Sequence, residues 1–555
     1  MMFRKTLAVL GMTLLCLTTL GFSQDTDPAE DTVTQEEVDA LKAELKDLEK
    51  RVMKNEKKTG LDRINFTGDF RFQAHSIDAT IPTYFNGMEL QRLMVDNLFY
   101  VNGTGQFPPS QDDVSGFIQE NYADYLYYIN NVVTFDWLKE VVGQFPPEMM
   151  QQFMGMLLPH TYQEGYDYTN DIIYTNRLRL NMNAKVADSV DFAGRLSMYK
   201  VWGDSTGVQV FNGQANSINI DGTTATVPNS DILRVERAYF TWHSPKFYLS
   251  IGRRPSTGGT PLNFREDEPR GGTPLGSVIN YQFDGATLGW HISDKSTVRL
   301  CYGIGYESGF GSGDQLKLPQ DRLNDATFFG INWDIWNTDD MFIQAMVARA
   351  FDVTDGFNGL VVMPTNPVNG QGMPPFVMRF TPSANLGDID WASTVMTRRD
   401  GPFDWFISLN YVQTDPNNIT TPFGGLMSDP FEVPEKQDGY MYYVGARYNF
   451  NNNKTKLGFE YNHGSEYWFN FAISEDDLLA PKTSTRGDVY ELYLTHRIHK
   501  RFVLKLDYIR YDFDYSGSGW HLGAPKDLNA QMPPILGFPT YDKATKYMLS
   551  FSARF

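Results

Sequence analysis

From Asn65 onward the chain is a series of short segments in which apolar and polar residues alternate, joined by connections that are alternately short and long. Alternation at every second position is typical of a β-strand with two different faces. Transmembrane β-barrels have short turns on one side of the membrane and long loops on the other, whereas a soluble sandwich has no reason to sort its connections. We therefore predict an all-β fold, a transmembrane antiparallel β-barrel of about 16 strands within residues 62–555.

The strand count is even, as in bacterial barrels, and the Asn, Asp, Ser and Gly residues of the short connections favour tight reversals. The predicted strands are residues 64–75, 174–185, 191–202, 233–242, 247–253, 278–291, 297–306, 327–336, 341–351, 388–396, 403–413, 440–450, 455–463, 489–497, 502–511 and 547–555. The long connections are residues 76–173, 203–232, 254–277, 307–326, 352–387, 414–439, 464–488 and 512–546.

The alternation also predicts which side chains face lipid. In residues 174–185, Leu178 and Leu180 alternate with two arginines. A basic residue on the lipid face at mid-bilayer would cost about 2–4 kcal/mol, so we expect the arginines to face the lumen. The predicted basic wall of the lumen consists of Arg177, Arg179, Lys185 and Arg195.

The last strand ends the chain on an aromatic residue after regular alternation. Such an ending resembles the C-terminal signal that the assembly machinery of bacterial outer-membrane barrels reads. The residues of this predicted signal are Tyr547, Leu549, Phe551 and Phe555.

The N-terminus has the pattern of a secretory signal peptide. Arg4 and Lys5 precede the apolar stretch 7–20, and small residues follow it, so we expect residues 1–23 to be removed. The stretch is too short for a transmembrane helix, and the chain has no other apolar run of about 18 residues. A lipoprotein site at Cys16 is an alternative, although Leu15 stands where a small residue is expected.

Residues 24–34 are acidic and predict a linker, and residues 35–58 predict a short coiled-coil helix in the periplasm. The apolar positions recur with three- and four-residue spacing between charged flanks. An isolated helix of this length is marginally stable in water, which favours self-association. A single amphipathic helix that folds back onto the barrel is the alternative. The predicted seam is Val38, Leu41, Leu45, Leu48 and Val52.

Composition supports the barrel and excludes several classes of function. Aromatic residues reach 14% while the mean hydropathy is only −0.38, as expected for strands that are half apolar with aromatic girdles. The formal charge of −19 becomes −21 when Arg4 and Lys5 are removed, which argues against nucleic-acid binding. Cys301 would be the sole remaining cysteine, so an intrachain disulfide and cysteine-ligated cofactors are excluded.

The third long connection carries the predicted constriction of the lumen. By its place in the count of connections, the loop of residues 254–277 resembles the third external loop of general porins, which folds inward and forms the constriction. Opposed acidic and basic groups there would create a strong local field that sorts solutes by charge. A solvated surface loop whose charges pair with one another is the alternative. The candidate residues are Arg253, Arg254, Arg265, Glu266, Asp267, Glu268 and Arg270.

The first long connection contains a predicted helical insertion, residues 77–171. Residues 88–100, 114–142 and 147–157 have helical length and are rich in Met, Tyr and Phe, with prolines between them. Loops this long are usually functional or disordered, and the apolar content argues against disorder. We expect a helical cap, with a plug and a cover of the subunit interface as alternatives.

Sequence motifs for catalysis or metal binding are weak. The glycines of 303–313 lie at a strand end without a following helix, which argues against nucleotide binding. His496 and His499 bracket a turn without a third ligand, and the His residues do not cluster with Cys or carboxylates at metal-site spacing. The serines near the histidines lack the nucleophile-elbow context that a phospholipase would need. We predict neither an enzyme nor a cofactor.

Residues 251–254, the following 255–261 and the run 280–289 (NYQFDGATLG) resemble an uncharacterised family of porin-like bacterial outer-membrane proteins. That resemblance implies a signal peptide and a short coiled coil ahead of an outer-membrane barrel, and it assigns no substrate. By analogy with porins of this size, we expect a homotrimer.

We therefore predict an outer-membrane porin for passive diffusion of small hydrophilic solutes, with lipid and the barrel assembly machinery as its other partners. One alternative is a sheath around a partner such as a multihaem cytochrome, which would need more strands. The other is a substrate-specific channel or receptor, which would show saturable uptake.

Overall fold

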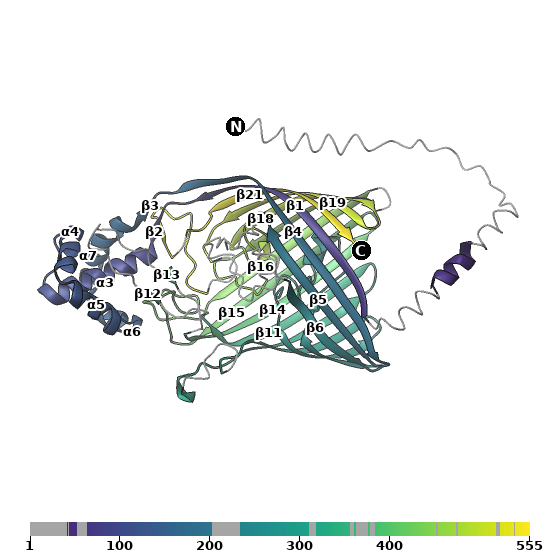
Figure 1. Cartoon of the computed structure of the whole chain (residues 1–555), viewed down its shortest axis with the longest axis horizontal. Coiled ribbons are helices and arrows are strands. Elements are labelled where there is room, and N and C mark those ends of the chain that lie inside the picture. The colour runs from purple at the N-terminus through teal and green to yellow at the C-terminus, as the bar shows by residue number, and fades with distance from the viewer. Residues whose placement is uncertain are drawn as a thin grey trace.

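The computed structural model of the chain describes residues 42, 44–52, 64–202, 233–309, 318–355, 360–361, 376–377, 383–450, 453–472, 476–517, 522–537 and 539–555. Its centre is a closed antiparallel barrel of 16 strands (Figure 1). No helix in the described part of the chain is both long enough and apolar enough to cross a membrane.

The barrel confirms the predicted fold class and strand count, with each strand paired to its neighbours along the chain. The strands are β1 (Ile64–Ile81), β4 (Tyr166–Ala187), β5 (Val190–Val201), β6 (Arg234–His243), β7 (Phe247–Arg253), β8 (Asp284–Ser293), β9 (Ser296–Tyr306), β10 (Ala326–Asn337), β11 (Met341–Thr354), β14 (Asn385–Asp400), β15 (Phe403–Pro416), β16 (Asp438–Phe450), β17 (Thr455–Gly464), β18 (Gly487–His499), β19 (Phe502–Phe513) and β21 (Lys543–Arg554).

The ring closes between the first and last strands, β1 and β21. Their register runs from Asp69 opposite Arg554 to Thr80 opposite Lys543. The backbones of Gly68 and Phe555 extend it with two reciprocal N–H···O hydrogen bonds of 2.9 Å. Closure leaves no sheet edge, and a sheet in lipid needs this because no water is present to pair with free backbone groups.

Several strand boundaries differ from the sequence prediction, and the largest shifts are at β1, β4 and β8. β4 begins at Tyr166 rather than at 174, so the helical insertion is shorter than the predicted 77–171. β1 continues to Ile81 rather than ending at 75, because Ile77, Ala79 and Ile81 face inward and are buried in an apolar cluster. β8 begins at Asp284 rather than at 278. Val278 and Ile279 are apolar, as strand residues would be, but they pack among the buried residues of an inward loop.

The outer face of the barrel is apolar. Leu249, Ile251, Leu409 and Phe459 are exposed on outward-facing strand positions. Aromatic residues mark both ends of this surface, as in the girdles of transmembrane barrels. Near the short turns they include Trp242, Phe247, Trp290, Trp336, Phe403 and Phe502, and towards the long connections Tyr174, Tyr411, Tyr440, Tyr490 and Tyr547.

The inside of the barrel is largely filled by the long connections. The larger buried cluster joins inward residues of β10–β16, such as Trp391 and Phe406, to Val278 of one loop and to Trp468 and Phe471 of another. A second buried cluster joins inward residues of β1, β18, β19 and β21 to loop residues such as Leu479 and Leu528. Sixteen strands enclose a lumen too wide for strand side chains alone to fill, so the loops supply the remaining packing.

The first long connection carries five helices that project beyond one end of the barrel (Figure 1). They are α3 (Gly87–Thr104), α4 (Gln111–Glu120), α5 (Tyr122–Asn131), α6 (Phe135–Gly143) and α7 (Pro147–Leu157), followed by the 3-10 turn η1 (Leu158–Thr161). The predicted single helix 114–142 is three helices, because the chain breaks at Asn121 and again before Thr134, whose side chain caps α6.

Short elements complete the long-connection end of the barrel. A small sheet of β2 (Tyr84–Asn86), β3 (Tyr162–Gln163) and β20 (Ile535–Leu536) ties the base of the helices to the last long connection. The remaining elements are β12 (Leu360–Val361), β13 (Phe376–Val377), α8 (Leu262–Arg265), η4 (Pro319–Asp321) and η5 (Lys482–Ser484).

The N-terminal predictions fall mainly outside the described residues. This applies to the signal peptide 1–23, the linker 24–34 and the seam residues Val38 and Leu41. Residues 44–52 are helical, and Leu45, Leu48 and Val52 are exposed in the single chain. The coiled coil therefore stays a prediction.

Closure of the barrel predicts a specific sensitivity at Gly68. A Cβ there would lie 2.5 Å from the Phe555 ring and 2.8 Å from the backbone oxygen of Arg179, so movement of the ring alone would not relieve the clash. We expect Gly68→Val to cost about 1–3 kcal/mol by overpacking and to lower the fraction of heat-modifiable, folded barrel on SDS gels.

Gly155→Ala in α7 is the matched control, because a Cβ at Gly155 meets no atom within 4 Å. Equal folded fractions for the two variants would contradict this account of the closure between β1 and β21.

Candidate functional site

The loop of residues 254–283, between β7 and β8, crosses the lumen to the opposite wall. Phe264 packs edge-on against Phe406 of β15, with ring centroids 4.9 Å apart. Arg447 of β16 lies over the Phe264 ring and donates a 2.8 Å hydrogen bond to the Phe264 carbonyl. The neighbouring strand β17 is eight strands from β7 in either direction around the ring, so the loop spans the full width of the barrel.

Charged side chains hold the loop end on that wall. The Arg265 Nε lies 3.1 Å from an oxygen of Glu491 on β18. The Asp267 carboxylate accepts a 2.5 Å hydrogen bond from the Lys456 ammonium, with nitrogens of Arg447 and Arg497 at 3.2 and 3.3 Å. These contacts tie the charges of the loop end to side chains of β16, β17 and β18 on the opposite wall.

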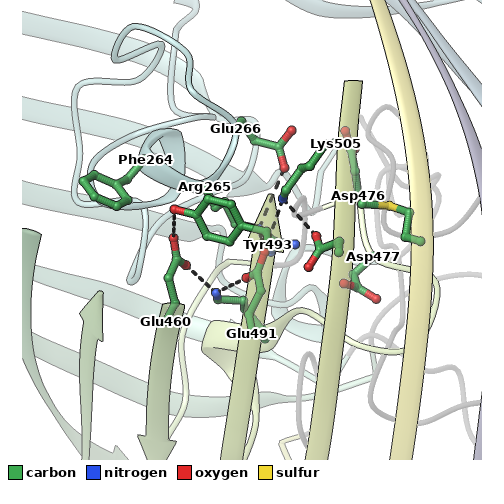
Figure 2. A network of polar contacts seen from close by, with 12 residues as sticks. Phe264, Arg265, Glu266, Glu460, Asp476, Asp477, Glu491, Tyr493 and Lys505 are labelled. Carbon is green, nitrogen blue, oxygen red and sulfur yellow. Dashed lines mark hydrogen bonds and ion pairs between the residues drawn. The ribbon is translucent and has the colours of Figure 1, made fainter. Parts of the chain in front are cut away.

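A buried network of charges lies beneath the loop end (Figure 2). Lys482 of a second loop pairs with Glu460 at 2.6 Å and with Glu491. Glu491 also pairs with Lys505 at 3.3 Å, and Tyr493 donates to Glu460 at 3.2 Å. Buried charges are tolerated only when they are paired and hydrogen-bonded, so this network forms a rigid base for the loop.

The second loop, residues 465–486 between β17 and β18, also folds inward and packs against the first. The Asn280 N–H donates to the Phe471 carbonyl, and the Phe471 N–H donates to the Val278 carbonyl, both at 2.8 Å. This loop brings Asp476 to the wall formed by β1 and β4, where it accepts from Arg71 at 2.8 Å and from Arg177 at 2.5 Å.

The facing wall carries a cluster of arginines, which we call the arginine wall. It lies on four adjacent strands, β6, β5, β4 and β1. Arg71 stands directly opposite Arg177, and Arg195 directly opposite Arg237. Like charges in cross-strand pairs destabilise a sheet, and carboxylates placed between them offset part of that cost. The members are Arg71, Arg177, Arg179, Arg195 and Arg237.

Three carboxylates are fixed within the arginine wall. Glu236 is fully buried, 3.2 Å from Arg179 and 3.1 Å from Arg195. Asp69 pairs with Arg177 at 3.0 Å, and Asp476 bridges Arg71 and Arg177. Among the described residues, the wall therefore holds five arginines against three carboxylates and carries a net positive charge.

Between the arginine wall and the loop lies a cavity of about 350 Å³. Glu266 and Glu268 face it from the loop with 34% and 35% of their side chains exposed, more than any arginine of the wall. A Glu266 oxygen lies 3.6 Å from Arg71. The lining residues include Arg71, Arg177, Arg179, Arg195, Arg237, Asn263, Arg265, Glu266, Glu268, Arg270, Asn280 and Asp476.

The charge state of the loop carboxylates follows from their neighbours. Burial raises the pKa of Glu266, but Lys505, Arg71 and Arg265 outweigh it and lower the pKa to about 2. Burial likewise raises the pKa of Asp267, but the hydrogen bond from Lys456 and the charge of Arg447 lower it below its ordinary value. Both carboxylates are therefore ionised at neutral pH.

The structure separates the predicted constriction residues into two groups. Those that line the cavity are Arg265, Glu266, Glu268 and Arg270 from the loop, and Arg177, Arg179 and Arg195 from the wall. The others, Arg253, Arg254, Asp267 and Lys185, do not line it.

Each of these four has a physical reason for lying elsewhere. Arg253 follows Ile251 on the outward face of β7 and pairs with Asp284. Arg254 donates a hydrogen bond to the hydroxyl of Ser250 on β7. Asp267 points away from the cavity to β16–β18, and Lys185 is 67% exposed beside Asp188 at a short turn.

Five charged residues at the arginine wall were missed from the sequence, and one of them is Asp69, which pairs with Arg177. Arg71 is the inward neighbour of the outward Phe70 and Phe72, so its alternation in β1 carried a signal. Glu236 and Arg237 are adjacent in sequence yet both reach the site, because the β5–β6 pairing shifts register at this point, which re-aims a side chain. Asp476 had no signal, since its position depends on the path of the second loop.

One further cluster brings together residues that sequence spacing did not connect. Ligand atoms of His463, Asp488 and Asp514 lie within 4.8 Å of one another, at the long-connection ends of β17, β18 and β19. His463 and Asp488 already share a 2.9 Å hydrogen bond, and Asn529 donates to Asp514 at 3.2 Å. The cluster lies on different strands from the arginine wall and does not line the cavity.

The anchoring role of Phe264 can be tested directly. Its buried ring is held between Phe406 and Arg447, and loss of a buried Phe side chain typically costs about 3–5 kcal/mol. We expect Phe264→Ala to release the loop end from β15 and β16, opposite the arginine wall. This release would raise the single-channel conductance and its fluctuations in planar bilayers.

Phe107→Ala, at a half-exposed ring beyond α3, is the control and should leave conductance unchanged. Parental conductance in Phe264→Ala would show that the loop does not depend on this anchor.

The structure and the sequence were compared with those of known proteins. Solved structures of similar shape include the OprB protein of Pseudomonas putida (8% identity, 90% of this chain and 96% of that chain, TM-score 0.41). They also include the trimer form of OmpT of Vibrio cholerae (11%, 89% and 99%, TM-score 0.37) and a mutant Rh. blastica porin (11%, 89% and 100%, TM-score 0.36). No curated protein matches the sequence.

A family model matches residues 167–555, which covers most of the barrel, both inward loops and all of the arginine wall except Arg71. The chain belongs to the family described as protein of unknown function DUF3373.

Proposed function

We propose that this protein is an outer-membrane porin through which small hydrophilic solutes diffuse passively past a charged constriction. The observation that carries the proposal is the inward loop, which holds Glu266 and Glu268 across a cavity from the arginine wall inside a closed barrel. A binding surface without transport would not need such an arrangement in the middle of a lumen.

The two sides of the lumen support a defined route for solutes. Along β10–β16 the inward side chains and both loops form a dry apolar cluster that includes Trp391, Phe406 and Trp468. Along β4–β6 and β1 the inward side chains are charged and border the cavity. Water and polar solutes avoid the first side, so the route runs along the arginine wall.

Charge selection at this point follows from electrostatics. Two unit charges 4 Å apart interact by about 1 kcal/mol in bulk water but about 4 kcal/mol in the lower effective dielectric of a protein surface. A permeating ion between Glu266 and the arginine wall is exposed to these stronger interactions. Each step is binding and release, with no chemical reaction.

The filled lumen also bears on the sheath hypothesis. A barrel that encloses a partner protein needs an interior free of its own loops, and here the loops and inward side chains form buried clusters. With 16 strands the ring is also smaller than a sheath would require. We therefore favour solute passage.

We also propose that the chain forms a homotrimer whose N-terminal helices associate in the periplasm. Leu45, Leu48 and Val52 are exposed on the single chain, and association would bury them. The short turns and the C-terminus, where Arg554 bonds to Arg501, lie at one end, which would face the periplasm. The outward Tyr547, Leu549, Phe551 and Phe555 would be read there by the assembly machinery.

Ion selectivity tests the constriction. Replacement of Glu266 and Glu268 by Gln removes the negative side of the cavity and leaves the arginine wall, so the reversal potential in a KCl gradient should shift towards anions. Because the pKa of Glu266 is about 2, this carboxylate stays ionised as the pH falls from 8 to 4. The shift caused by Glu266→Gln should therefore be the same at pH 4 as at pH 7.

Glu120→Gln, at an exposed position of α4 outside the barrel, removes the same charge far from the cavity and should have no effect. An unchanged reversal potential in the double variant would exclude the constriction.

The oligomer is tested by deletion of residues 38–52. If the helices associate through their apolar seam, the deleted protein should migrate as a smaller or less stable species on native gels while its barrel stays heat-modifiable. Migration and dissociation temperature equal to the parent would remove the role of the coiled coil.

A further inference from the structure

We infer that the cavity is a binding subsite for small zwitterions, such as an amino acid or a dipeptide. The carboxylate of the solute would bind the arginine wall, and its ammonium group would lie between Glu266 and Glu268. This inference rests on the proposed porin function and deepens it by naming a class of solute.

The positive side has hydrogen-bond donors to spare. A guanidinium carries five N–H donors, yet among the described residues Arg71 donates only to Asp476, and Arg237 donates only to Thr257. The Nε atoms of Arg71, Arg177 and Arg237 are buried without an acceptor among the described residues. Adjacent guanidinium groups with free donors suit a carboxylate, which accepts two parallel hydrogen bonds from arginine.

The negative side has spare acceptors. Among the described residues, the nearest cation to the Glu266 carboxylate is Arg71 at 3.6 Å, and the nearest to Glu268 is Arg554, also at 3.6 Å. Both distances exceed that of a normal hydrogen bond, and neither carboxylate accepts one from a described side chain. An ammonium group, with three donors, would satisfy both.

The two sides together select against simple ions. An anion attracted by the arginine wall meets Glu266 and Glu268, and a cation attracted by these meets the arginines. A zwitterion presents the matching charge to each side and gains both interactions, as electrostatic complementarity requires.

The size and the remaining polar groups fit such a solute. The volume of about 350 Å³ lies at the lower end of the range for small-molecule sites. Asn263 lines the cavity, and its side-chain oxygen is buried without a partner among the described residues. This oxygen could accept the amide N–H of a dipeptide.

Block of single-channel KCl current by three peptides of similar size tests the inference at pH 7. Glycylglycine is zwitterionic, N-acetylglycylglycine is an anion only, and glycylglycinamide is a cation only. We expect glycylglycine to reduce conductance in a saturable way, with a half-blocking concentration at least fivefold below that of either capped peptide.

Substitution of either side should abolish this preference. In Arg179→Gln and in Glu266→Gln, the half-blocking concentration of glycylglycine should rise to within twofold of the capped peptide that suits the remaining charge. Lys185→Gln, at a solvent-exposed turn outside the cavity, is the control and should behave as the parent. KCl conductance and heat-modifiable migration establish that each variant is folded.

Equal block by N-acetylglycylglycine in the parent would reveal a plain anion site and overturn the inference, as would a conducting pore that no peptide blocks. Both outcomes leave the porin function intact. Absence of any KCl conductance in the folded parent would overturn the porin function itself, and the inference with it.

Discussion

The structure depends on one constraint, that every backbone N–H and C=O group of a sheet in lipid must have a partner within the protein. Pairing of β1 with β21 satisfies it by closing the ring. The constraint extends to the last residue, because the backbone of Phe555 is hydrogen-bonded to that of Gly68. The Phe555 ring occupies the space that a side chain larger than hydrogen would need at position 68. Closure also creates the problem that the rest of the chain solves, since 16 strands surround a wide lumen.

The long connections solve that problem in two chemically different ways. Against β10–β16 they bring Val278, Phe471 and Trp468 into an apolar cluster, whose few polar groups, such as the indole N–H of Trp468, are hydrogen-bonded to loop carbonyls. Against β4–β6 and β1 they bring charged side chains. Burying these is costly unless each charge is paired and hydrogen-bonded with good geometry. The buried network of Lys482, Glu460 and Glu491 provides that rigidity beneath the loop end.

Strands, faces and loop sides could be predicted because they follow from local patterns. Alternation places Leu178 and Arg179 on opposite faces whatever lies beyond the strand, and short polar turns fix which strands are neighbours. The same reasoning found the acidic loop end of Glu266 and Glu268, since a charged run between Gly and Pro residues stands out in the sequence. It also assigned Asp267 to the cavity, and this was wrong. A local sequence pattern does not give the direction of a side chain where the backbone turns.

By itself the sequence determined that the chain forms a closed, two-faced sheet with arginines directed inward, because the period of a strand is a property of its own residues. Only the tertiary structure decided that Asp476 would meet Arg71 and Arg177 and that Arg265 would reach Glu491 across the lumen. These contacts join positions hundreds of residues apart, and which loop charge meets which wall charge depends on how two inward loops pack against each other. No local pattern records that packing, so the cavity exists only once the barrel has closed around it.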